Sequence, residues 1–158
     1  MLDTLEYLKH ETTVWLEITT LLIPGLNDAT GETEAMSRWI VERLGPDVPV
    51  ALHRVPPGLE AAATGRPRRR RRSCRAREIA LAAGIRYAYT GNVHDPAGQS
   101  TRCHRCGAVL IGRDWYELGA WRLDADGRCA ACGERCAGVF EGRPGRWGAR
   151  RLPVRLGA

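Results

Sequence analysis

The sequence has no hydrophobic run long enough to cross a membrane, and it has almost no lysine. Its longest apolar stretch, residues 79–85, falls far short of the ~20 residues that a membrane-spanning helix needs. The first ten residues are acidic and amphipathic, whereas a signal peptide begins with a basic segment followed by an apolar one. We therefore expect a cytoplasmic protein without a membrane partner.

The positive charge is confined to one short segment. Lysine and arginine number 24 against 18 acidic residues, which gives a net charge of +6. Arg66 and the run Arg68–Arg72 carry six of these charges, so the rest of the chain is neutral. Surfaces that bind nucleic acid usually spread their basic residues over a face or along a helix. We therefore do not expect a nucleic-acid partner. A zinc-ribbon module that binds nucleic acid or protein is kept as the alternative function of the chain.

Patterning in the first hundred residues predicts α/β units. The chain has 158 residues, of which 44% are hydrophobic and 27% charged, as in folded proteins. Periodicity and turn residues predict helices over 2–11, 30–44 and 75–83, and strands over 14–23, 48–52 and 85–89. This order is typical of a parallel sheet, and the strand over 14–23 is apolar enough to be mostly buried. The loops 24–28 and 90–95 would then lie at the carboxyl ends of strands, where such sheets carry their sites.

Cysteine, glycine and tryptophan become more frequent after Gly98, and helical periodicity ends there. We place a domain boundary near residue 99. The predicted organisation is an α/β domain over 1–98, with an irregular basic linker over 53–73, and a ribbon-like tail over 99–158.

Two cysteine knuckles in the tail predict a metal site. Cys103-x-x-Cys106 and Cys129-x-x-Cys132 are each followed by glycine, which permits the positive φ of a tight turn. Two such pairs are typical of a closed, tetrahedral four-cysteine site that is structural, with zinc as the ion and iron as the alternative. A tail of this size buries too little core to fold alone, so the metal would hold it together. Cys136 and His104 are weaker competing ligands, and Cys136 is expected to be a small buried hydrophobe.

Several segments resemble a known family when they are taken together. Residues 3–8 (DTLEYL), 17–28 (EITTLLIPGLND) and 89–93 (YTGNV), with the two knuckles, resemble the C-terminal part of the AmmeMemoRadiSam system radical SAM enzymes. These enzymes are relatives of the pyruvate formate-lyase activating enzymes. The resemblance covers residues 1 to about 50 and 75–158.

The resemblance implies the C-terminal part of a partial (β/α) radical SAM barrel. In the parent enzyme a [4Fe–4S] cluster and S-adenosylmethionine generate a 5′-deoxyadenosyl radical. The protein binds and orients the reacting groups and keeps water away from them. The C-x3-C-x2-C loop that holds the cluster in this family is absent from this sequence. We therefore expect an inactive fragment without catalytic residues, whose partner is a missing N-terminal half and whose substrate is unknown.

The same resemblance suggests which residues would meet the cofactor. If alternate residues of the strand point the same way, Glu17 and Thr19 line the barrel interior near S-adenosylmethionine. Glu17 could instead make a structural pair, and Thr19 could simply favour the strand. Asn27 is a further candidate contact, although asparagine in such a loop often satisfies its own turn.

Residues 53–73 depart from the family pattern. They include five consecutive arginines, and a one-base shift in a GC-rich gene would restore a family-like reading. We hypothesise a pair of compensating frameshifts. The alternative is a genuine basic linker that is solvated and disordered.

Overall fold

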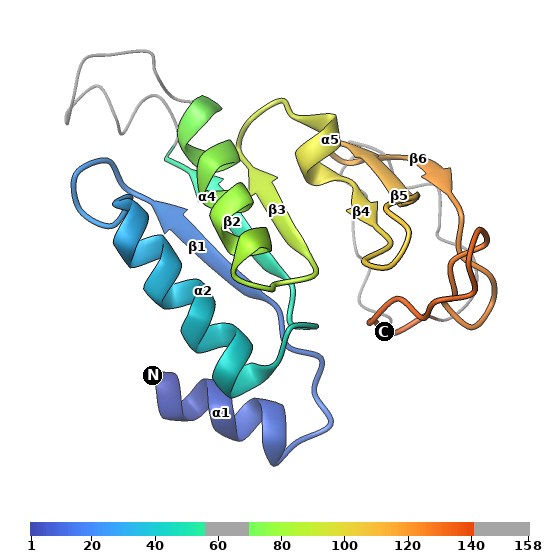
Figure 1. Ribbon diagram of the computed structural model, residues 1–158, viewed down its shortest axis with the longest axis horizontal. Coiled ribbons are helices and arrows are strands. Elements are labelled where there is room, and N and C mark those ends of the chain that lie inside the picture. Colours follow the sequence, from blue (N-terminus) through green and yellow to red (C-terminus); the bar gives the residue numbers. More distant parts are fainter. Residues whose placement is uncertain (56–69, 141–158) are drawn as a thin grey trace, which may run out of the picture.

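The computed structural model describes residues 1–55 and 70–140 of the chain. Most of the predicted basic linker over 53–73, including Arg66, Arg68 and Arg69, lies outside these residues. Strands β1 (Ile18–Leu22), β2 (Val50–Arg54) and β3 (Ala88–Gly91) form a parallel sheet in the order β1-β2-β3 (Figure 1). A mixed α/β class is therefore confirmed. In the described part of the chain, no helix combines the length and the apolar character needed to cross a membrane.

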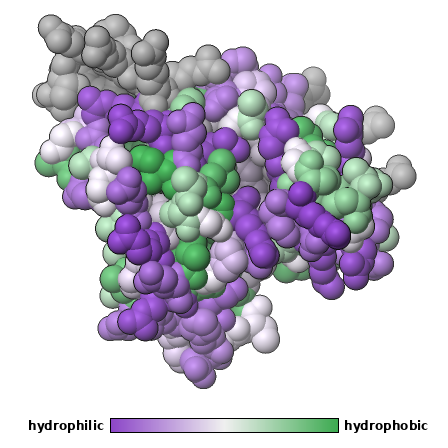
Figure 2. All heavy atoms as spheres, in the orientation of Figure 1, coloured by the Kyte–Doolittle hydropathy of each residue, from purple (hydrophilic) through white to green (hydrophobic). Residues whose placement is uncertain are grey.

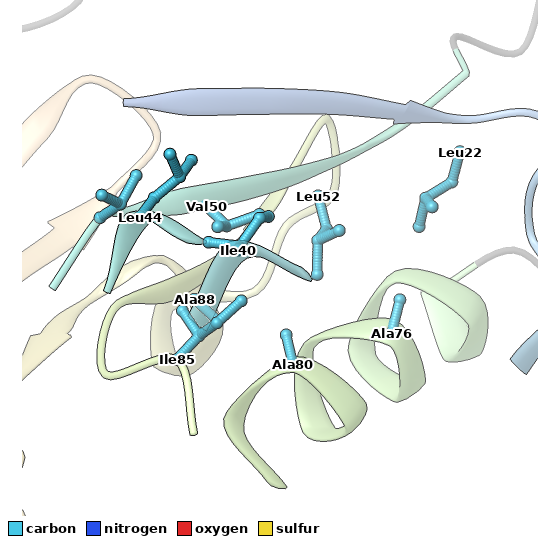
Figure 3. Packing of buried hydrophobic residues seen from close by; sticks show 10 residues of the cluster. Leu22, Ile40, Leu44, Val50, Leu52, Ala76, Ala80, Ile85 and Ala88 are labelled. Carbon is cyan, nitrogen blue, oxygen red and sulfur yellow. The ribbon is translucent and has the colours of Figure 1, made fainter. Parts of the chain in front are cut away.

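Helices cover one face of this sheet. Helices α2 (Thr30–Leu44) and α4 (Arg70–Ala82) pack on it, and α1 (Leu2–His10) lies against α2. Between helices and sheet lies a core of aliphatic side chains that converge in Figure 3. Its members are Leu22, Ile40, Leu44, Val48, Val50, Leu52, Ala76, Ala80, Ile85 and Ala88. The outer surface of the helices is mainly hydrophilic (Figure 2), as expected for amphipathic helices on a sheet.

Helices α2 and α4 leave the opposite face of the first sheet uncovered. Ile18 and Leu22 belong to the core or pack against it, whereas Thr19 and Leu21 between them are exposed. The prediction of a mostly buried strand over 14–23 was wrong. Strand β1 begins only at Ile18, and its side chains alternate between the core and the uncovered face because successive residues of a strand point to opposite sides.

Element boundaries differ from the predicted ones where short-range signals were weak. Strand β2 runs two residues past the predicted end at Leu52, to Arg54. Helix α4 begins at Arg70 and not at Arg75, so the end of the arginine run is helical. Strand β3 starts at Ala88 and not at Ile85, because Gly84 turns with a φ of +107° and the Ile85 N–H still bonds to the carbonyl of Ala80.

The second sheet is antiparallel and follows a short helix. Helix α5 (Pro96–Gln99) leads into β4 (Thr101–Arg102), β5 (Val109–Asp114) and β6 (Glu117–Trp121), in the order β4-β5-β6. Residues 122–140 are largely irregular, with isolated bridges from Leu123 to Cys129 and from Arg128 to Arg135. A second core joins the two parts, since Tyr87 of the first packs with Cys103, Leu110, Ile111, Leu123, Cys129 and Cys136 of the second.

Candidate functional site

The four predicted cysteines come together at one point. The sulfurs of Cys103, Cys106, Cys129 and Cys132 all lie within 4.8 Å of one another. Two of the sulfur–sulfur distances, Cys103 to Cys132 and Cys106 to Cys129, are 3.6 and 3.7 Å. Tetrahedral zinc with Zn–S bonds of about 2.3 Å would separate its sulfurs by about 3.8 Å. The cluster is thus positioned to bind a metal ion.

Each knuckle forms the same tight turn. The N–H of Gly107 donates to the carbonyl of Cys103, and the N–H of Gly133 donates to that of Cys129, at 2.9 and 2.8 Å. Both glycines have a positive φ, +75° and +73°, as predicted from their place after the second cysteine. The first cysteine of each knuckle is buried, whereas Cys106 is exposed and Cys132 is half-buried.

The thiols influence one another's ionisation. The backbone N–H of Ala131 donates to the Cys129 sulfur and lowers the pKa of that thiol to about 7. A backbone N–H from Glu134 lowers the pKa of Cys132, but burial and the neighbouring sulfurs of Cys106 and Cys103 outweigh it and raise the pKa to about 12. Four thiols this close cannot all ionise without a cation between them, and a bound metal would supply that charge.

The competing ligands lie outside this cluster. Cys136 is buried, and its sulfur contacts the carbonyl of Ala137. The imidazole of His104 faces the carboxylate of Glu134 at 3.7 Å and the hydroxyl of Tyr87 at 3.4 Å. The metal-binding group among the described residues therefore consists of four cysteines alone.

A cavity of about 650 Å³ lies between the uncovered face of the first sheet and the second part of the chain. That volume is within the range of pockets that bind small molecules. The sheet contributes Glu17, His53 and Tyr89, and β5 contributes Arg113. The remaining wall is rich in aromatic side chains, including Trp15, Trp115, Tyr116, Trp121 and Phe140.

The predicted cofactor contacts are only partly brought together. Glu17 lines the cavity, and its carboxylate accepts a hydrogen bond from the Trp15 indole at 2.9 Å. Thr19 is exposed on the same uncovered side of β1. The amide of Asn27 bonds within its own turn, donating to the Leu21 carbonyl at 3.0 Å and accepting from the Ile23 N–H at 2.6 Å. The cofactor role of these three residues stays a prediction.

The loops after the strands hold further polar groups. Asp95 is buried and accepts hydrogen bonds from Thr90 at 3.0 Å and from the thiol of Cys74 at 3.5 Å. His94 is exposed and faces Asp114 at 3.2 Å. Asp28 accepts from the N–H of Gly25 and pairs with Arg72 of the arginine run. These contacts all tie loops to neighbouring elements.

Sequence reasoning missed three residues of the cavity. Tyr87 and Arg113 were not singled out, and Tyr89 was named only as part of the family-like segment 89–93, although the spacing of the two tyrosines places both on one side of a strand. The hydroxyl of Tyr87 accepts the Ala137 N–H at 3.1 Å, and that of Tyr89 bonds to Thr101 at 3.0 Å. Arg113 comes from a different sheet, so no local pattern could have placed it here.

An archaeal protein is similar in sequence to this chain. The chain is 31% identical over 123 residues, or 77% of its length, to an uncharacterized protein of Methanocaldococcus jannaschii. It spans about 37% of the length of that relative. No family model and no solved structure matches the chain.

Proposed function

We propose that the four-cysteine cluster binds one structural zinc ion. The observation that carries this proposal is the convergence of four thiols, from two knuckles of identical turn geometry, within 4.8 Å. All four tetrahedral positions are then filled by the protein, so the site has no open position for a substrate. Its task is to hold the second sheet and the irregular segment 122–140 together.

Metal content and colour test the choice of ion. Purified without added metal, the chain should contain one zinc per molecule and absorb no visible light, because Zn²⁺ has a filled d shell. A red product with one iron per molecule would identify the alternative, an iron site on the same ligands. A metal-free chain that fails to take up either ion would reject a metal site.

We further propose that the chain is the C-terminal part of a radical SAM enzyme. The supporting observation is a parallel sheet in sequential order with α2 and α4 on the same face. A segment of a (β/α) barrel would have this arrangement, with the helix-free face as the interior. The uncovered face here carries Glu17, His53 and Tyr89 along a cavity.

The residues of this chain suit the binding of S-adenosylmethionine but do not include the family's cluster-binding loop. The four clustered cysteines belong to two C-x2-C knuckles and not to the C-x3-C-x2-C loop of the family, so this chain offers no cluster site. S-adenosylmethionine has an adenine ring, a ribose and an amino acid, and the aromatic and polar lining of the cavity suits such a ligand. When bound beside a [4Fe–4S] cluster, S-adenosylmethionine supplies a carbon radical.

The chain's own residues would bind and shield that group. Glu17, held by the Trp15 indole, would accept hydrogen bonds, and Thr19 on the same strand would extend the polar surface. The aromatic wall of the cavity would exclude water. The cluster-bearing half would come from a separate polypeptide or from an upstream part of the gene.

Titration with S-adenosylmethionine tests this proposal on the chain itself. We expect the indole N–H resonance of Trp15 to shift in the zinc-loaded protein, and Glu17→Ala to weaken binding severalfold. Glu6→Ala, which removes a half-buried carboxylate of α1 that pairs with Arg43 and does not line the cavity, is the matched control. Absence of any shift at millimolar S-adenosylmethionine would reject a cofactor role for this face.

A further inference from the structure

Arg113 is held in place without a negative charge to balance it. One of its terminal nitrogens, Nη1, donates to the Thr101 hydroxyl at 2.6 Å and to the Gln99 carbonyl at 3.3 Å. Its guanidinium carbon lies 5.6 Å from the centre of the Tyr89 ring, which is the distance of a cation–π contact. All these partners are neutral, and within residues 1–55 and 70–140 no carboxylate forms an ion pair with Arg113.

The rest of the guanidinium is available to a ligand. A guanidinium has five N–H groups, of which those on Nη1 are used. The N–H groups of Nε and Nη2 form no hydrogen bond within the described part of the chain, and together they make the fork that binds a carboxylate or phosphate through two bonds. Because neutral groups fix the side chain at Nη1, little conformational entropy would be lost on binding.

The cavity around Arg113 is suited to a flat organic body. Trp115, Tyr116 and Trp121 of the β5–β6 hairpin contribute to its wall. Trp115 sits at the tip of this hairpin with a φ of +54°, a left-handed conformation that a bulky residue rarely adopts. Asp114 pairs with Glu117, so Trp115 is the first central residue of a two-residue hairpin turn, and such a turn requires a positive φ there.

Beside Arg113, the described lining of the cavity holds one carboxylate, Glu17, and one imidazole, His53, together with tyrosines and Cys136. His53 packs against Gly91, and one carboxylate oxygen of Glu17 accepts a hydrogen bond from the Trp15 indole. Tyr89, which lies under Arg113, is half-buried and bonded to Thr101. Among the described residues that line the cavity, Arg113 is thus the permanent positive charge, and it comes from the second sheet.

We propose that this cavity binds an organic anion, whose carboxylate or phosphate pairs with the free edge of Arg113 and whose flat body lies against the hairpin tryptophans. The inference stands apart from the radical SAM proposal because its central residue belongs to the cysteine-rich part. The two can fail separately, since one is tested with S-adenosylmethionine and the other with simple aromatic anions.

Binding of small aromatic probes tests the proposal. The zinc-loaded, nitrogen-15-labelled chain is titrated with phenylacetate, with phenyl phosphate, with the neutral phenylacetamide and with the cation benzylamine. We expect at least one anion to bind ten times or more tightly than the amide and the amine. The Nε–Hε resonance of Arg113 and the indole resonances of Trp115 and Trp121 should move. The preferred anion decides between a carboxylate and a phosphate ligand.

Matched variants identify the responsible residue. Arg113→Gln should weaken anion binding at least tenfold while phenylacetamide binding is unchanged. Arg122→Gln, at an exposed arginine of the same region, should leave both unchanged. If Arg113→Gln loses zinc or spectral dispersion, Arg113→Lys is tested in its place. Lysine keeps the positive charge but lacks the two-bond fork, so the preference for the anion over the amide should fall severalfold. Equal binding of acid and amide, preference for benzylamine, or no movement of the Arg113 resonance would each overturn the proposal.

Discussion

Gly91 lies so close to His53 that no side chain fits between them. A Cβ built at Gly91 would meet the His53 imidazole at 2.5 Å. Gly91→Ala should therefore force His53 out of place and lower the free energy of unfolding by about 1–3 kcal/mol. Urea denaturation followed by circular dichroism measures this.

The control for this prediction is another glycine. Gly31 has no atom near the position of a Cβ and lies in helix α2, so Gly31→Ala should be neutral or stabilising by up to about 1 kcal/mol. A Gly91→Ala variant as stable as the wild type would mean that His53 moves freely in the cavity.

The cysteines differ in their roles even though all lie near the same core. Cys129→Ser should lose the bound metal on dialysis and unfold the second sheet, because three ligands hold zinc far less tightly than four. Cys136→Ala should keep one metal per chain, since its sulfur is outside the cluster. Metal analysis after dialysis distinguishes the two, and metal loss from Cys136→Ala would implicate that sulfur as a ligand.

At the scale of elements, the segment around β3 joins the two parts of the molecule. Tyr87 and Tyr89 present their rings to the cysteine-rich part, and burial is the main cause that raises the pKa of each above the usual value of 10. A phenol that ionises less readily in the folded state than in the unfolded state stabilises the fold below pH 10. That contribution is lost as the pH rises above 10.

We therefore expect the urea midpoint to fall as the pH is raised from 9 to 11. Tyr87→Phe removes one of the two phenols, so the decline should be shallower in that variant. The variant should also be less stable at neutral pH by about 1 kcal/mol, because the Ala137 N–H loses its acceptor. Parallel pH profiles for the two proteins would show that Tyr87 ionises equally in both states.

At the scale of the whole molecule, two cores depend on different forces. The first is a set of aliphatic side chains under α2 and α4 (Figure 3), and the second surrounds the cysteines. Removing the metal should therefore unfold β4–β6 and leave the first sheet folded. Hydrogen exchange before and after chelation should show lost protection at Leu110 and Ile111 and unchanged protection at Ile40. Equal loss in both parts would mean that the molecule folds as one unit.

Sequence patterns were sufficient where the determining interactions are local. The two knuckles were predicted because cysteine spacing and the following glycine define a turn that positions two sulfurs. The helix over 30–44 was predicted with its observed bounds, because its apolar spacing and the Gly45-Pro46 stop lie within the segment. Burial along β1 was mispredicted, since composition alone does not reveal that only one face of the sheet is covered.

The sequence by itself determined the α/β class of the first part and the identity of the four clustered cysteines, because both depend on neighbours a few residues apart. Only the tertiary structure decided that Tyr87 belongs to the second core and that Glu17 and Arg113 line one cavity. These pairings join residues separated by tens of positions, and they form only when burial of apolar surface brings the two sheets together.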